Sequence, residues 1–128
     1  MTGKTPWKPP APTAPGDERL HLRLAVNTLD DHKAIDTVVL DIRKLSEAAD
    51  YFVVTSGSSD VHVRALAEHV EGVLDRAGLP PHHVEGVRAG RWALLDYVDF
   101  VVHVFHPTLR QFYQLERLWA DAPTVTME

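Results

Sequence analysis

Residues 90–122 read GRWALLDYVDFVVHVFHPTLRQFYQLERLWADA, and this stretch decides the fold of the chain. The runs 91–96 and 99–105 are rich in apolar side chains bounded by polar residues, which is typical of β-strands. Only residues 97–98 separate the two runs, so we expect an antiparallel hairpin. The proline that follows has the φ angle of a first helical residue, and a last helix is therefore predicted over 107–119.

This stretch carries more bulky apolar side chains than one buried face can absorb. Surplus apolar surface on a small protein usually has a partner. Tryptophan, tyrosine and histidine join an apolar body to a polar tip, which favours them at interfaces. For Trp92, His103, Tyr113 and Trp119, a place in the core and a place in a binding surface therefore both stay open.

Upstream of this stretch the chain alternates between strand patterns and helical patterns. The predicted elements are a helix over 18–33 with Asp17 as its N-cap, strands over 37–42 and 51–55, a helix opened by residues 56–60 and ended by Gly78, and a short strand beginning at Val84. The sequence thus predicts an α/β fold, a single compact domain with a mixed five-stranded sheet packed by helices.

The two ends of the chain differ from its middle. Residues 1–17 contain five of the nine prolines and almost no aliphatic side chains, so we expect a flexible Pro-rich tail. The folded domain is predicted over 18–122, and residues 123–128 are predicted as a C-terminal tail. No segment has the apolar core of a signal peptide or the length of a membrane span, and there is no cysteine, so a cytoplasmic protein is expected.

The formal net charge of the chain is −5, with lysine and arginine scattered along it. Direct nucleic-acid binding needs a basic face to neutralise phosphates, and it is therefore disfavoured. A basic protein partner suits this charge better.

The segment Ser56-Gly57-Ser58-Ser59 lies between a predicted strand and a predicted helix, where free helix amides can hold a phosphate. No lysine follows it, and Asp60 places an anion where the phosphate would lie. The spacing also matches neither of the common nucleotide-binding motifs. An ordinary helix N-cap is the favoured interpretation.

A second chemical possibility concerns the hairpin. Asp96, Asp99, His103 and His106 supply carboxylates and imidazoles, the ligands of a metal-dependent nucleotidyltransferase or hydrolase. His103 and Asp99 share a strand parity, whereas His106 has the opposite one. Turn residues and solvated charges are favoured over catalysis here, so no catalytic residue, metal or cofactor is expected.

Three blocks of the chain closely resemble the ribosomal silencing factor family, also called the Iojap-like family. They are DIRKLSEAADYFVVTSGSS, GRWALLDYVDFVVHVFHP and FYQLERLWADA, in that order. The resemblance implies a non-enzymatic translational repressor whose fold is a nucleotidyltransferase-like core without catalytic residues. It also implies a partner, the fourteenth protein of the large ribosomal subunit, and repression by hindering subunit joining, chiefly when nutrients run short. Some members of the family form homodimers.

The resemblance also suggests which residues bind the partner. We expect an apolar centre flanked by acids that pair with lysine or arginine of the basic ribosomal protein, and Trp119 beside them. The predicted partner-binding residues are Trp92, His103, Phe105 and Tyr113 at the centre, Asp96 and Glu116 as the acids, and Trp119.

One position departs from the family pattern. Members usually have glycine where this chain has Val98, and glycine suits a turn that needs positive φ. A β-branched residue does not, so we expect either a different turn type or a locally altered hairpin.

Overall fold

Five strands form one mixed sheet in the order β1-β2-β5-β4-β3. The computed structural model describes residues 19–113 and 120–126. In chain order the elements are α1 (Leu20–Asp31), β1 (Ile35–Asp41), β2 (Tyr51–Ser56), α2 (Asp60–Arg76), β3 (His83–Glu85), β4 (Trp92–Asp96), β5 (Phe100–Phe105) and α3 (Pro107–Tyr113). Strands β2 and β5 pair in parallel, and the other neighbours pair antiparallel. The predicted α/β fold with a mixed five-stranded sheet is confirmed.

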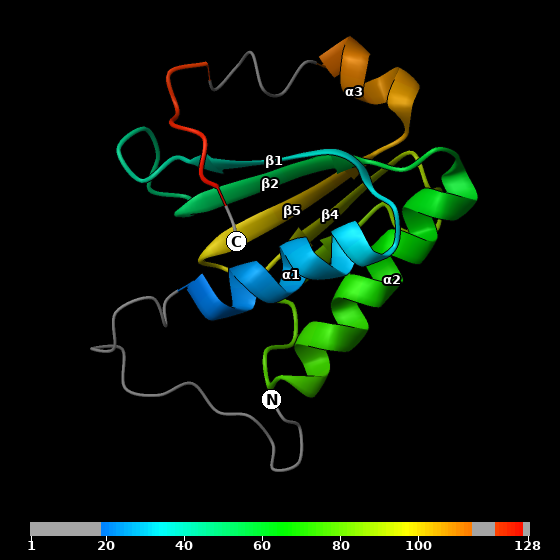
Figure 1. The fold of residues 1–128 in the computed structure, drawn as a ribbon, viewed down its shortest axis with the longest axis horizontal. Helices are drawn as coiled ribbons and strands as arrows, with labels where there is room; N and C mark the ends of the chain where they lie inside the picture. The colour runs from blue at the N-terminus through cyan, green and yellow to red at the C-terminus, as the bar shows by residue number, and fades with distance from the viewer. Residues whose placement is uncertain (1–18, 114–119, 127–128) are drawn as a thin grey trace.

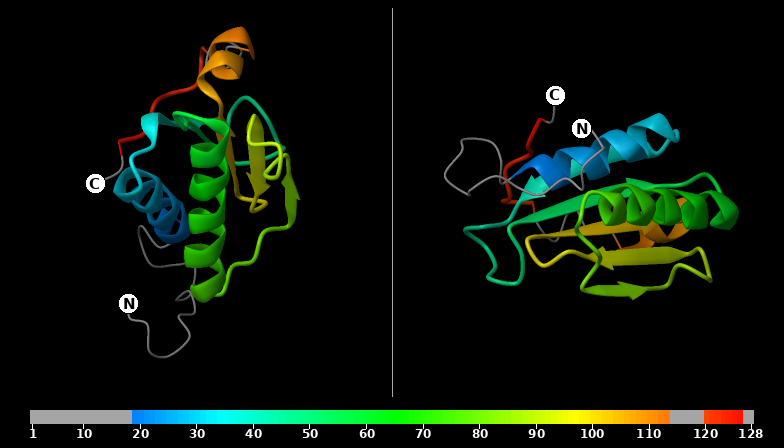
Figure 2. Two further views of the ribbon diagram at one scale, coloured as in Figure 1. Left: turned by 90° about the vertical axis from the view of Figure 1, so that its right-hand side faces the viewer. Right: turned by 90° about the horizontal axis from the view of Figure 1, so that it is seen from below.

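Helices α1 and α2 lie on the same side of the sheet, and α3 lies beyond the end of β5 (Figures 1 and 2). Side chains divide accordingly into two buried clusters. Leu29 of α1 and Leu66 of α2 pack on Leu95 and Val102 of the sheet in the first cluster. The second cluster contains Phe105 and, at its margin, Leu109 of α3. Alternation along each strand sends successive side chains to opposite clusters.

A side chain caps the N-terminus of α2, whereas no side chain caps the N-terminus of α1. The Ser59 hydroxyl accepts a hydrogen bond from the His62 amide at 3.1 Å, which confirms the N-cap interpretation of residues 56–60. Gly78 follows α2 with φ of +88°, as predicted for its end. Helix α1 instead has Arg19 at its N-cap position and no side-chain cap hydrogen bond. The predicted cap at Asp17 lies outside the described residues. None of the helices within the described ranges is long and apolar enough to cross a bilayer.

The turn between β4 and β5 has a positive φ angle at Val98, a backbone conformation that glycine adopts more readily than valine. Val98 has φ of +73°, and the Asp99 amide donates to the Tyr97 carbonyl at 2.8 Å. A hydrogen bond across three residues with φ near +75° marks the rare, strained form of the γ-turn. The Asp96 carboxylate accepts from the Val98 amide at 2.8 Å and holds the turn in place. The chain therefore forms a tight turn with positive φ although valine replaces the usual glycine, and the backbone of Val98 is strained.

Replacing Val98 with glycine should raise the free energy of unfolding by about 1 kcal/mol. A β-branched side chain in the left-handed region costs roughly 1–2 kcal/mol, and the greater freedom of glycine in the unfolded chain returns part of that. Val98 is 57% exposed, so little apolar burial is lost. Urea denaturation measures the change, and Val61→Gly, at an exposed helical position, is the matched control that should lose stability. A lower stability of Val98→Gly would contradict strain at this turn.

Residues 123–125, predicted as the start of a C-terminal tail, lie along the outer edge of β1. The Asp41 amide donates to the Pro123 carbonyl at 2.9 Å, and the Val125 amide donates to the Val39 carbonyl at 2.8 Å. Leu40 and Thr124 form an antiparallel bridge. This short addition satisfies backbone groups that an edge strand otherwise presents to other chains.

Candidate functional site

Six side chains from three neighbouring strands gather on the sheet face opposite α1 and α2. Register partners share a face, and here the pairs are Phe52 with Val101, Leu94 with His103, and Trp92 with Phe105. We call these six residues the aromatic face. Four of them, Phe52, Trp92, Leu94 and Val101, are half-buried and expose part of their apolar surface.

His103 forms the buried centre of the aromatic face. It is 5% exposed, and its ring meets that of Phe52 edge-on with 4.8 Å between centroids. The Trp92 indole Nε1 donates a hydrogen bond to His103 Nδ1 at 3.2 Å. Because Nδ1 is the acceptor, a neutral ring carries its proton on Nε2. Burial lowers the pKa of His103 to about 4, so the ring is neutral at pH 7.

Trp92 is held in place by its neighbours on β5. Its ring stacks on Phe105 with 4.8 Å between centroids and an interplanar angle of 30°. The hydrogen bond to His103 fixes the other end of the indole. A half-exposed tryptophan with a fixed ring is the kind of side chain that anchors protein interfaces, since little conformational entropy is lost when a partner binds.

Two predicted contact residues lie too deep to touch a partner directly. Phe105 is 0% exposed and His103 is 5% exposed. Their predicted place at the apolar centre of a docking patch stays a prediction, and in this structure both lie on the central strand β5 beneath Trp92. Their place in this structure is to support Trp92 from below.

The remaining predicted site residues lie at different places. Asp96 is half-buried, and its carboxylate is engaged by the Val98 amide in the turn. Tyr113 is the last residue of α3, and its side chain is not described. Glu116 and Trp119 lie outside the described residues. A partner-binding role for these four residues stays a prediction.

Three members of the aromatic face, Phe52, Leu94 and Val101, were not among the predicted site residues. Phe52 lies on β2, far from the hairpin in sequence, and the parallel pairing of β2 with β5 places it beside Val101. The spacing of residues along the chain does not predict that β2 pairs with β5. Parity along the strands was the signal that could have identified two of the three, since Val101 shares the parity of His103 on β5 and Leu94 shares that of Trp92 on β4.

Protonation of His103 should destabilise the fold at acid pH. The ring titrates near 6.5 in the unfolded chain and near 4 in the folded one. Between these pH values unfolding takes up a proton, so the free energy of unfolding falls as the pH falls through this window. At 1.36 kcal/mol per pH unit, the full loss is about 3 kcal/mol near pH 4. Urea denaturation at pH 7 and near pH 4.5 measures the loss.

The chain has eight histidines, so a control must isolate His103. In His103→Gln, the difference in stability between the two pH values should shrink by about 2–3 kcal/mol. An unchanged difference would show that other groups carry the acid sensitivity.

The four residues of the possible metal-dependent enzyme do not converge. Asp96 and Asp99 flank the turn at one end of β5, and His106 follows its other end. A strand of six residues spans roughly 20 Å, far more than one metal ion can bridge. No group of three or more histidines, aspartates or glutamates able to hold a metal occurs among the residues that the structure describes. This arrangement contradicts a shared catalytic site built from these residues.

Two amides of the Ser56–Ser59 segment donate to acceptors within the chain. The Gly57 amide donates to the Phe105 carbonyl at 3.0 Å, and the Ser58 amide donates to His62 Nδ1 at 2.8 Å. A side chain at Gly57 would meet the Val63 backbone nitrogen at 2.8 Å, which explains glycine there. A phosphate would have to displace these internal bonds.

Comparison with known proteins gives one consistent result. The family profile described as "Ribosomal silencing factor during starvation" matches residues 15–128. Proteins named ribosomal silencing factor from Halalkalibacterium halodurans and Bacillus subtilis are 44% and 40% identical to this chain over 107 residues. Each alignment covers 84% of this chain, and 92% and 91% of those relatives. A crystal structure of a Chromobacterium violaceum protein has a TM-score of 0.76 and 38% identity, covering 78% of this chain and 83% of that one.

Proposed function

The chain belongs to the ribosomal silencing factor family, and from this membership we propose that it binds the large ribosomal subunit through its fourteenth protein and blocks joining of the small subunit. The proposal assigns the contact to the aromatic face. Repression would operate mainly under nutrient limitation, as the description of the family profile suggests. The action needs ribosomes in the same compartment, so the protein is placed in the cytoplasm.

The observation that carries this assignment is the half-exposed Trp92 held by two buried neighbours. Its ring is fixed by the His103 hydrogen bond and the Phe105 stack. Phe52, Leu94 and Val101 surround this region with further half-buried apolar surface. A rigid apolar patch of this kind supports a stable docking surface, for which about 800 Å² per partner is typical.

Charge supports a basic partner. The net charge of −5 favours association with a positively charged protein. Glu116 and Asp96 are proposed to pair with its lysine or arginine residues at the rim of the contact. The repression itself is steric: an obstacle on the joining surface excludes the other subunit, and no covalent bond is made or broken.

Sedimentation tests the proposal with the full chain. The protein should co-sediment with isolated large subunits, and adding small subunits afterwards should yield fewer joined ribosomes than in its absence. Failure to co-sediment would overturn the proposal, and so would turnover of a nucleotide at an enzyme-like rate. A dilution series also shows whether a homodimer competes for the same surface, since binding would then rise as the dimer dissociates.

A further inference from the structure

A pocket of about 170 Å³ opens beside Trp92, where the aromatic face meets the edge strand β3. Its described lining residues are Glu85, Gly86, Trp92 and Leu94. Glu85 of β3 is in register with Leu94 of β4, so its side chain lies on the same side of the sheet as the aromatic face. Small-molecule sites usually enclose roughly 300–1,000 Å³, so this smaller pocket suits one long side chain of a partner.

Gly86 brings the acid and the indole together. It has φ of +77°, and a side chain at this position would overlap the Trp92 carbonyl oxygen. The backbone that follows β3 therefore passes directly against the backbone at the start of β4, an approach that glycine permits. As a result, Glu85 and Trp92 form two walls of the same pocket.

The carboxylate of Glu85 is held in place and accessible. His83 Nε2 donates a hydrogen bond to Glu85 Oε2 at 2.6 Å, and no hydrogen bond to the other oxygen, Oε1, forms within the described part of the chain. The Glu85 side chain is 66% exposed. No lysine or arginine is among the described lining residues. The pocket therefore offers a carboxylate oxygen to a cation that enters from outside.

The second wall of the pocket is aromatic. Phe105 stacks on the Trp92 indole, and the half-buried Trp92 borders the pocket with part of its remaining surface. A cation over an indole ring is attracted by the electrons of the ring. A planar guanidinium group can stack on the ring and donate to a carboxylate at the same time, whereas the compact ammonium group of lysine does not stack.

We propose that this pocket binds the side chain of one arginine of the partner, stacked on Trp92 and paired with Glu85. The identity of the partner rests on the proposed function, whereas the chemistry of the pocket follows from its walls. The inference adds Glu85 to the contact residues, on a strand that contains none of the predicted site residues.

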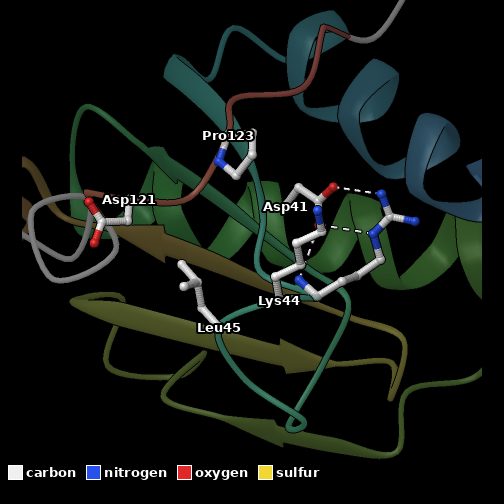
Figure 3. Close-up of a pocket in the computed structure, with 6 residues that line it drawn as sticks. Asp41, Lys44, Leu45, Asp121 and Pro123 are labelled. Atoms are coloured by element: carbon white, nitrogen blue, oxygen red, sulfur yellow. Dashed lines mark hydrogen bonds and ion pairs between the residues drawn. The ribbon is translucent and has the colours of Figure 1, made fainter.

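A larger groove elsewhere on the molecule fits an arginine less well. It encloses about 640 Å³ between the loop after β1 and residues 121–123 (Figure 3). Arg43 donates to the Asp41 carboxylate there at 2.9 and 2.7 Å, and Lys44 also lines the groove. These two positive charges repel a further guanidinium. Leu45, which lines the same groove, therefore provides an internal control.

N-acetyl-arginine amide, titrated into the full chain, tests the chemistry of the pocket by itself. The indole N–H signal of Trp92, identified by its loss in Trp92→Phe, should shift in the NMR spectrum, and the Leu45 amide signal should not. Glu85→Gln should reduce the shift roughly threefold, the effect of losing one exposed ion pair. N-acetyl-lysine amide should shift the signal less than the arginine probe. Equal shifts in the parent and Glu85→Gln would overturn the inference, as would a lysine probe that acts as strongly as arginine.

Co-sedimentation with large subunits tests whether the partner uses the pocket. Glu85→Gln should weaken binding roughly three- to tenfold, between the effects of an exposed and a buried charge pair. Glu68→Gln, the same change at an exposed residue of α2 on the other side of the sheet, should bind like the parent. If the parent does not co-sediment but the arginine probe acts through Glu85, the proposed function fails and the pocket stands. If the parent co-sediments and Glu85→Gln binds equally well, the inference is overturned and the proposed function stands.

Discussion

Replacing Trp92 with alanine should weaken binding to the large ribosomal subunit by roughly 30- to 700-fold. Central aromatic anchors typically contribute 2–4 kcal/mol when truncated, and each 1.4 kcal/mol is a factor of ten. Trp92 meets the requirements of such an anchor, because it is half-exposed and its ring is fixed by Phe105 and His103. Co-sedimentation with purified large subunits at increasing protein concentration measures the affinity.

Truncation of Trp92 also affects the fold, so the comparison needs two further variants. Trp92→Phe keeps a ring on Phe105 and removes only the indole donor, and it should lose less binding than Trp92→Ala. Val61→Ala is the matched control, since Val61 is 61% exposed on α2, outside the aromatic face. Its binding should equal that of the parent chain. Unchanged binding of a folded Trp92→Ala protein would show that the docking surface lies elsewhere.

Replacing Phe105 with alanine should lower the free energy of unfolding by about 3–5 kcal/mol, the usual cost of deleting a buried phenylalanine. Phe105 is 0% exposed and belongs to the second buried cluster with Val54 and Ala122. A small domain has only about 5–15 kcal/mol of stability in total, so this loss is a large fraction of it. Urea denaturation measures it.

A conservative substitution of Phe105 distinguishes a residue that supports Trp92 from one that touches the partner. Phe105→Leu fills most of the same volume and should cost about 1 kcal/mol of stability. Because Phe105 is covered by Trp92, a folded Phe105→Leu protein should bind the large subunit within a few-fold of the parent. A loss of binding as large as that of Trp92→Ala would mean that Phe105 itself touches the partner.

The hairpin of β4 and β5 shows which features of the fold the local sequence pattern predicts. Apolar runs on both sides of residues 97–98 predicted two antiparallel strands, and the structure has them as β4 and β5. The pattern left the turn open, whereas the structure has Val98 at φ of +73°. Pairing in the sheet brings the two strand ends so close that only a tight turn fits, whichever residue stands there.

The sequence predicted which types of residue would form the candidate site, but it did not predict how deeply each side chain would be buried. The predicted site included Trp92 and His103, and the register of β4 with β5 places both on the aromatic face. Depth follows from neighbours distant in sequence: His103 is buried because Phe52 of β2 and Trp92 of β4 flank it on both sides. The same burial sets its pKa near 4.

The amino-acid sequence by itself determined the elements, the strand parities and the cap at Ser59, because these depend on side chains within a few residues of one another. Only the tertiary structure decided that β2 lies parallel to β5 and that residues 123–125 cover the edge of β1. These features depend on which strand edges meet, and that choice minimises exposed apolar area and unpaired backbone groups over the whole chain rather than over any short segment.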